Sequence, residues 1–176
     1  TYMNALLPDT LPDTLGIIGS GAIGIEFASF YNGLGSKVDV FESKENILPN
    51  EDKDISDKLK SIMEKKGINF HNNINITDIH AKEKVNLKIE GEEKNLFEFD
   101  KILLAIGVEG NVNNLGLENT SIKVINTQIQ THRFGSTDDE KFFAIGDVAG
   151  TPWLAHKASH EGIACVESLY GEKKHS

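Results

Sequence analysis

A glycine-rich run near the amino end limits the fold of this chain more than any other feature. The apolar run Leu15–Ile18, typical of a buried strand, is followed at once by Gly19-Ser20-Gly21-Ala22-Ile23-Gly24. Ala22–Leu34 then has apolar residues at helical spacing and precedes Gly35, a residue typical of a helix C-cap. A G-x-G-x-x-G sequence between a strand and a helix indicates a turn that binds a dinucleotide.

The glycines of this run have different steric roles in such a turn. We expect Gly19 to make the tight turn, Gly21 to admit a pyrophosphate close to the backbone, and Gly24 to let the helix pack near the strand. Backbone amides and the helix dipole then bind the phosphates. The predicted site also contains the residues between the glycines, which are Ser20, Ala22 and Ile23. The alternative is a glycine-rich turn without a ligand.

Two acidic residues are candidates for ribose contacts. Glu42 follows the next predicted strand, Lys37–Phe41, about twenty residues beyond the glycines. A carboxylate there accepts hydrogen bonds from an adenosine ribose diol and repels a 2′-phosphate, so the sequence favours NAD over NADP. The alternative is a solvated strand end. Glu26 either favours the dipole of its helix or lies near the nicotinamide ribose, and the residues alone do not separate these interpretations.

The strand and helix pattern continues through the first half of the chain. A helix is expected at Asp54–Lys66 and strands at Ile68–Phe70 and Lys101–Ile106. The helix should present one apolar face formed by Ile55, Leu59, Ile62 and Met63. Three short segments between these strands predict an antiparallel meander, at Ile76–Ala81, Val85–Glu90 and Leu96–Phe99. The predicted fold class is α/β, with a Rossmann-like parallel sheet, helices on both faces and the meander as a crossover.

The last third of the chain has a different pattern. Gly110–Leu117 is rich in Asn and Gly and marks a predicted boundary between residues 1–118 and residues 119–176. We expect a buried strand at Phe142–Ile145 and a helix at His156–Leu169. The second segment is too short to form a domain of its own. Because the chain begins at Thr1 and not at a methionine, we expect it to be either processed or cut from a longer protein.

Composition excludes several classes of function. A formal net charge of -9 gives no electrostatic reason to bind nucleic acid or an anionic membrane. Cys165 is the only cysteine, which excludes an internal disulfide or a CxxC pair, and we expect it to be a core residue. His156 and His160 are four residues apart but lack the further ligands of a zinc pattern, so no metal site is expected.

Several strings together resemble one known family. They are Gly19–Glu26, Leu104-Ala105-Ile106-Gly107 and Ala144-Ile145-Gly146-Asp147-Val148, in this order and with suitable spacing. The chain therefore resembles the pyridine nucleotide–disulfide oxidoreductases. Leu154-Ala155-His156-Lys157-Ala158, followed by Glu161-Gly162, is similar to the dihydrolipoamide dehydrogenases within that family.

The resemblance implies sites for two cofactors, NAD and FAD. For NAD it implies that the glycine run binds the pyrophosphate, Glu26 lies near the nicotinamide, Glu42 binds the adenosine ribose, Ile76 lies beside the adenine and Gly107 lies on the nicotinamide side. For FAD it implies a ribityl contact at Asp147 and an approach to the flavin by Gly146, Trp153, Leu154, Ala155 and His156. Asp147 as a simple cap and Trp153 as plain packing are the alternatives.

The resemblance also implies an activity for the whole protein. Such enzymes oxidise dihydrolipoamide through a cysteine pair and FAD and pass hydride to NAD. Their partners are lipoyl-bearing subunits of 2-oxo acid dehydrogenase or glycine cleavage systems. We expect a homodimer in a bacterial cytoplasm or a mitochondrial matrix.

This chain departs from the family pattern at Val108-Glu109-Gly110, where a basic pair and a proline are usual. The FAD fingerprint and the cysteine pair would lie upstream, and the catalytic His-Glu pair and dimer interface downstream, so the fragment alone should be inactive. The alternatives are a glutathione-reductase-like enzyme and a non-catalytic nucleotide-binding module.

Overall fold

The computed structural model describes residues 2–91 and 95–171, which form two compact units, Thr1–Gly107 and Val108–Ser176. The sequence predicted the boundary after residue 118, which follows the glycine- and asparagine-rich segment Gly110–Leu117. In the structure the boundary precedes this segment. Gly110 explains the difference, because its N–H donates to the Thr127 hydroxyl at 3.1 Å and its Cα lies against the Thr127 carbonyl. This segment is therefore packed within the second unit.

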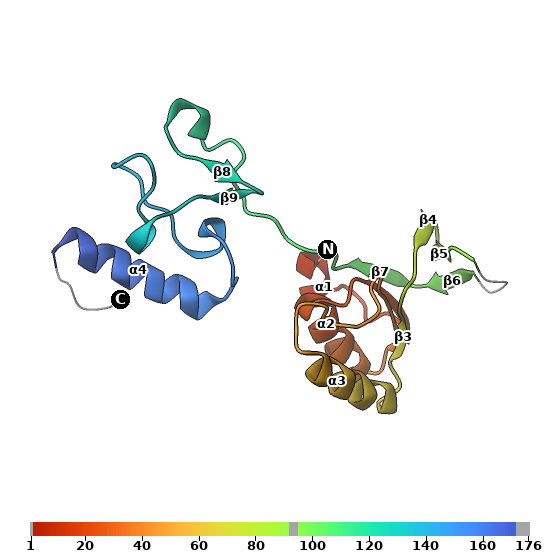
Figure 1. Ribbon diagram of the computed structural model, residues 1–176. Helices are drawn as coiled ribbons and strands as arrows, with labels where there is room; N and C mark the ends of the chain where they lie inside the picture. The colour runs from red at the N-terminus through yellow and green to blue at the C-terminus, as the bar shows by residue number, and fades with distance from the viewer. Residues whose placement is uncertain (1, 92–94, 172–176) are drawn as a thin grey trace. The chain divides into compact units, whose positions relative to one another are not determined.

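A parallel sheet of four strands organises the first unit (Figure 1). The strand order is β3-β2-β1-β7, with β1 at Thr14–Ile18, β2 at Lys37–Phe41, β3 at Asn69–His71 and β7 at Lys101–Leu104. Helix α2 (Ala22–Gly33) connects β1 to β2, and helix α3 (Lys53–Lys65) connects β2 to β3. These elements confirm the predicted alternation of strands and helices.

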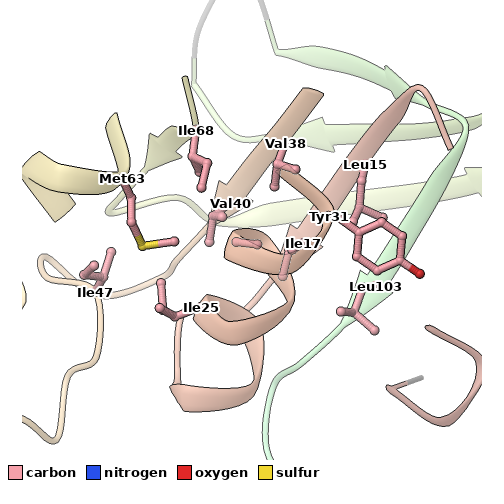
Figure 2. Packing of buried hydrophobic residues seen from close by; sticks show 11 residues of the cluster. Leu15, Ile17, Ile25, Tyr31, Val38, Val40, Ile47, Met63, Ile68 and Leu103 are labelled. Carbon is pink, nitrogen blue, oxygen red and sulfur yellow. The ribbon is translucent and has the colours of Figure 1, made fainter. Parts of the chain in front are cut away.

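The helices pack on one face of this sheet. Ile17 of β1 pairs in register with Val40 of β2, so their side chains point to the same face, where they meet Ile25 of α2 and Met63 of α3 (Figure 2). The same cluster contains Leu15, Ala28, Tyr31, Val38, Ile47, Ile68 and Leu103. This apolar layer fixes α2 at the position from which it reaches the candidate site.

The antiparallel meander covers the opposite face, so the prediction of helices on both faces is wrong. Its strands are β4 (Ile76–Ala81), β5 (Val85–Ile89) and β6 (Leu96–Phe99), in the order β4-β5-β6. Ile18 and Phe41, which point away from the helices, are buried against Leu87, Ile89 and Phe99 of the meander. The meander thus supplies the apolar cover that the sheet needs on this side.

Two helical details differ from the sequence predictions. Helix α1 (Tyr2–Leu6) lies in a stretch for which the sequence predicted no helix or strand, and the Tyr31 hydroxyl donates to the Ala5 carbonyl at 2.7 Å. A helix this short depends on such tertiary contacts. On α3, Ile55 and Ile62 are 61% and 42% exposed, so only part of the predicted apolar face is covered.

The second unit has little strand structure. It contains a hairpin of β8 (Val124–Ile125) and β9 (Gln128–Ile129), three 3-10 segments and helix α4 (Ala155–Leu169), whose Cys165 is buried as predicted. The segments are η1 (Leu117–Asn119), η2 (Arg133–Gly135) and η3 (Gly146–Ala149).

The predicted strand Phe142–Ile145 is wrong. Within the described residues, Phe143 forms only an isolated bridge with Ser136, and Phe142, Phe143 and Ile145 are between 38% and 46% exposed. Apolar composition alone does not make a strand when no neighbouring strand extends the pairing.

We expect Ile17→Ala to destabilise the first unit by about 2–5 kcal/mol, because it leaves a cavity between the sheet and the helices. Ile17 is fully buried, whereas Ile55 is 61% exposed and provides a matched control. Ile55→Ala should change the unfolding free energy by less than about 0.5 kcal/mol. Urea denaturation of both variants measures the difference, and equal losses would contradict the assigned core.

Candidate functional site

A cleft of about 550 Å³ lies at the carboxyl ends of β1, β2 and β7. It is lined by Ile18–Gly21, Phe41–Lys44, Pro49, Asn50, Ile74–Ile76 and Ala105–Gly107. The carboxyl edge of an open α/β sheet is where such folds bind ligands.

The structure brings many of the predicted NAD residues together in this cleft. Its lining includes Gly19, Ser20, Gly21, Glu42, Ile76 and Gly107. Four other predicted residues, Ala22, Ile23, Gly24 and Glu26, follow on α2 and are not part of the lining. Glu26 is exposed and lies with Leu6, Phe27 and Phe30 around a separate shallow groove.

The three glycines of the turn meet different surroundings. A Cβ on Gly19, whose φ is +99°, would overlap the Ala105 carbonyl, and a Cβ on Gly24 would overlap the Gly19 carbonyl. A Cβ on Gly21 would meet nothing within 4 Å, and its φ of -67° is open to any residue. The protein's own packing therefore requires Gly19 and Gly24, while the open space at Gly21 belongs to the cleft.

Helix α2 begins directly at this open space. Gly21 is its N-cap, and the first intrahelical bond runs from the Ile25 N–H to the Gly21 carbonyl at 3.0 Å. The N–H groups of the first turn of α2 have no acceptor inside the helix, and they form the positive end of the helix dipole. A phosphate that enters beside Gly21 meets these donors without steric obstruction.

Glu42 lies in the wall of the cleft and is only 9% exposed, so it is not a solvated strand end. Its Oε2 accepts hydrogen bonds from the Ser20 N–H at 2.9 Å and from the Ser20 hydroxyl at 2.6 Å. Its Oε1 accepts from the Lys44 N–H at 2.9 Å and from the Ser43 hydroxyl at 3.2 Å. The carboxylate is thus held by the turn after β1 and by the residues that follow β2.

Burial and hydrogen bonding act in opposite directions on this carboxyl. Burial raises the pKa of Glu42, but the hydrogen bonds from Ser20, Lys44 and Ser43 together lower that pKa by more. The pKa therefore lies below its ordinary value, and Glu42 is ionised at neutral pH. An ionised carboxylate accepts hydrogen bonds from ligand hydroxyls and repels a phosphate.

Sequence reasoning missed part of the cleft. Ser43, Lys44, Pro49 and Asn50 come from the segment after β2, and Ile74 and Asn75 precede β4. Ala105 and Ile106 could have been predicted, because they belong to the string Leu104-Ala105-Ile106-Gly107 that resembles the family.

The predicted flavin residues lie close together in sequence within the second unit. Gly146 and Asp147 belong to η3, and Ala155 and His156 begin α4. Gly146 is buried and Trp153 is half-buried. The other predicted flavin residues are exposed, namely Asp147, Leu154, Ala155 and His156. Among the described residues, the buried Nε1 of Trp153 has no hydrogen-bond partner.

Two residues of α4 hold η3 in place. Glu161 accepts a hydrogen bond from the Gly146 N–H at 2.8 Å, and Lys157 donates to the Gly150 carbonyl at 2.9 Å. Lys157 and Glu161 also form an ion pair at 3.0 Å. Burial raises the pKa of Glu161, but the hydrogen bonds from Lys157 and Gly146 lower it by more. The pKa of Glu161 therefore lies below its ordinary value.

The described residues offer neither a metal site nor a membrane-spanning helix. In the part of the chain that the structure describes, no group of three His, Cys, Asp or Glu side chains is arranged to hold a metal ion. None of the described helices has the length and apolar character needed to cross a membrane.

Comparison with known proteins identifies the family. Residues 1–162 match the pyridine nucleotide-disulphide oxidoreductase family, and this chain belongs to it. The chain is 40% identical over 174 residues to a dihydrolipoyl dehydrogenase of Rhizobium etli, and the match covers 97% of the chain and 36% of that relative. It is 39% identical over 179 residues to a dihydrolipoyl dehydrogenase of Bacillus subtilis, covering 99% of the chain and 38% of that relative.

Solved structures agree with this assignment. The HOCl-induced flavoprotein disulfide reductase RclA from Escherichia coli has a TM-score of 0.88 and 31% identity, covering 97% of this chain and 39% of its own. LpdA from Mycobacterium tuberculosis has a TM-score of 0.85 and 28% identity, covering 95% of this chain and 36% of its own. The chain therefore spans little more than a third of the length of these relatives.

The glycine geometry predicts that the same substitution costs much more stability at Gly24 than at Gly21. Gly24→Ala should destabilise the first unit by about 3 kcal/mol, because the added methyl group overlaps a backbone carbonyl. Gly21→Ala should change the unfolding free energy by less than about 1 kcal/mol, because its methyl group enters open space and only the preference for Gly over Ala at the N-cap is lost. Chemical denaturation compares the variants, and an equally large loss at Gly21 would show that the turn is packed differently.

Proposed function

We propose that the first unit is the NAD-binding portion of a flavoprotein dihydrolipoyl dehydrogenase. One observation carries the proposal: the cleft combines open space at Gly21 with a buried, ionised carboxylate at Glu42. A dinucleotide presents a pyrophosphate and a ribose diol, which match these features. The similarity to dihydrolipoyl dehydrogenases of two bacteria supports the same assignment.

Each part of the cleft would then contact one part of NAD. The pyrophosphate binds at Gly21 and the first turn of α2, where backbone N–H groups and the helix dipole favour an anion. Glu42 accepts hydrogen bonds from the adenosine ribose. Ile76 offers an apolar wall to the adenine, and Gly107 lies toward the nicotinamide. Glu26, which is exposed outside the cleft lining, would contribute only if the ligand extends along α2.

The second unit would contribute to a flavin site. Asp147 presents an exposed carboxylate that suits a ribityl hydroxyl, and the orphaned indole N–H of Trp153 suits an acceptor on the flavin. Leu154, Ala155 and His156 would approach the ring system at the start of α4. Lys157 and Glu161 hold η3, so Asp147 keeps its position. When bound, FAD and NAD supply the redox chemistry, and these residues orient them.

The whole protein would oxidise dihydrolipoamide on lipoyl-bearing subunits of 2-oxo acid dehydrogenase or glycine cleavage systems and reduce NAD. It would act as a homodimer in a bacterial cytoplasm or a mitochondrial matrix. The chain has a single cysteine, Cys165, so the dithiol step needs a cysteine pair from another part of the protein. This portion alone would bind NAD without turnover.

A second candidate is a disulfide reductase with another substrate. It is favoured by the likeness to RclA, a flavoprotein disulfide reductase, at a TM-score of 0.88. Among such reductases, glutathione-reductase-like enzymes mostly use NADP, and Glu42 opposes an enzyme of that type because a buried carboxylate repels the 2′-phosphate. Nucleotide preference therefore separates the two candidates.

We expect the full 176-residue chain to bind NADH at least about tenfold more tightly than NADPH in calorimetric titrations. Gly21→Val should abolish NADH binding, because its side chain fills the space beside the phosphates. Gly33→Val is the matched control, since a Cβ at Gly33 also meets nothing within 4 Å but lies outside the cleft. Preference for NADPH would favour the second candidate, and binding of neither nucleotide would contradict the proposed function.

A further inference from the structure

The two oxygens of the Glu42 carboxylate have different neighbours. An ionised carboxylate offers about two acceptor positions on each oxygen. Both positions of Oε2 are filled by Ser20, through its N–H at 2.9 Å and its hydroxyl at 2.6 Å. On Oε1 the Lys44 N–H is firmly placed at 2.9 Å, but the Ser43 hydroxyl is at 3.2 Å. Oε1 is therefore the oxygen that can exchange a partner.

The surroundings of the two serines support this distinction. Ser20 is fully buried and Ser43 is exposed. The Ser20 backbone is fixed as well, because its carbonyl accepts the Leu48 N–H at 2.9 Å. The Ser43 hydroxyl can rotate into solvent at little cost, whereas the Ser20 hydroxyl is confined beside the carboxylate. A ligand hydroxyl that arrives from the cleft can therefore replace Ser43 at Oε1 but not Ser20 at Oε2.

We propose that Ser20 is a positioning residue, which locks Oε2 of Glu42 and thereby presents Oε1 to a ribose hydroxyl of the bound dinucleotide. This inference rests on the proposed function of the cleft. Ser20 stands between Gly19 and Gly21, so the turn that approaches the phosphates also orients the carboxylate that binds the ribose. The two recognition elements of the cleft are then linked through one side chain.

The Ser20 hydroxyl has a second effect that a purely structural role would not produce. Its hydrogen bond is one of the contacts that lower the pKa of Glu42. Removing the hydroxyl raises this pKa, so the carboxylate becomes protonated at a higher pH. Because NADH binding needs the ionised form, affinity in a Ser20→Ala variant should fall at a higher pH during acidification than in the wild type.

The test compares serine-to-alanine variants of the full chain by calorimetric titration with NADH. Ser20→Ala should weaken binding about tenfold at neutral pH, as expected for one charge-assisted hydrogen bond. Ser43→Ala should instead tighten it slightly, because the ligand hydroxyl then reaches Oε1 without displacing the Ser43 hydroxyl. Ser36→Ala is the matched control, because Ser36 is 3% exposed and its hydroxyl donates to the Pro12 carbonyl at 2.6 Å outside the cleft. It should bind NADH like the wild type.

A double-mutant cycle with Glu42→Ala completes the test. If Ser20 acts through Glu42, Ser20→Ala should have no further effect on NADH affinity in the Glu42→Ala background. Wild-type affinity in Ser20→Ala, an unshifted pH profile, or an equal loss in both backgrounds would overturn the role of Ser20 while the proposed function stands. Absence of NADH binding by the wild type would instead overturn both.

Discussion

The close contact between Gly24 and the Gly19 carbonyl is the constraint on which the rest of the site depends. Without a side chain at either position, the first turn of α2 lies directly against the end of β1. The N-terminal end of α2 then lies at the edge of the sheet, where the positive end of its dipole and its unpaired backbone N–H groups face the cleft. A larger residue at Gly24 would push the helix away and move these donors out of the cleft.

The sheet gives this arrangement its rigidity, because the hydrogen bonding continues past the strands into the site. The Gly19 N–H donates to the Phe41 carbonyl at 2.9 Å, and the Ala105 N–H donates to the Ile18 carbonyl at 2.8 Å. The Glu42 N–H likewise donates to the His71 carbonyl at 2.9 Å. The floor of the cleft is therefore an extension of the parallel ladder. Beneath it, helices on one face and the meander on the other exclude water from the sheet.

Much of this architecture could be predicted from the sequence, because local patterns and packing agree. The glycine run, the buried strands and the meander each have a periodicity that matches one element. Glu42, Ile76 and Gly107 were predicted for the site and lie in the cleft. Their positions follow from the ends of strands, which the pattern defines well.

The remaining features depend on contacts that residue type does not reveal. Lys44 acts through its backbone N–H, and Pro49 and Asn50 reach the cleft through the path of a loop. Helix α1 is held by Tyr31, which is distant in sequence. Phe142–Ile145 has the composition of a strand, but a strand also needs backbone hydrogen bonds to a neighbouring strand, and residue type alone does not show whether such a neighbour is present.

Backbone amide NMR of the full chain during an NAD titration tests most directly the proposal that NAD binds in the cleft of the first unit. If NAD binds there, chemical-shift changes will appear at Gly19–Gly24, Glu42–Lys44 and Ile74–Ile76, with the largest at the start of α2. Changes confined to the second unit, or to the groove beside Glu26, would contradict it.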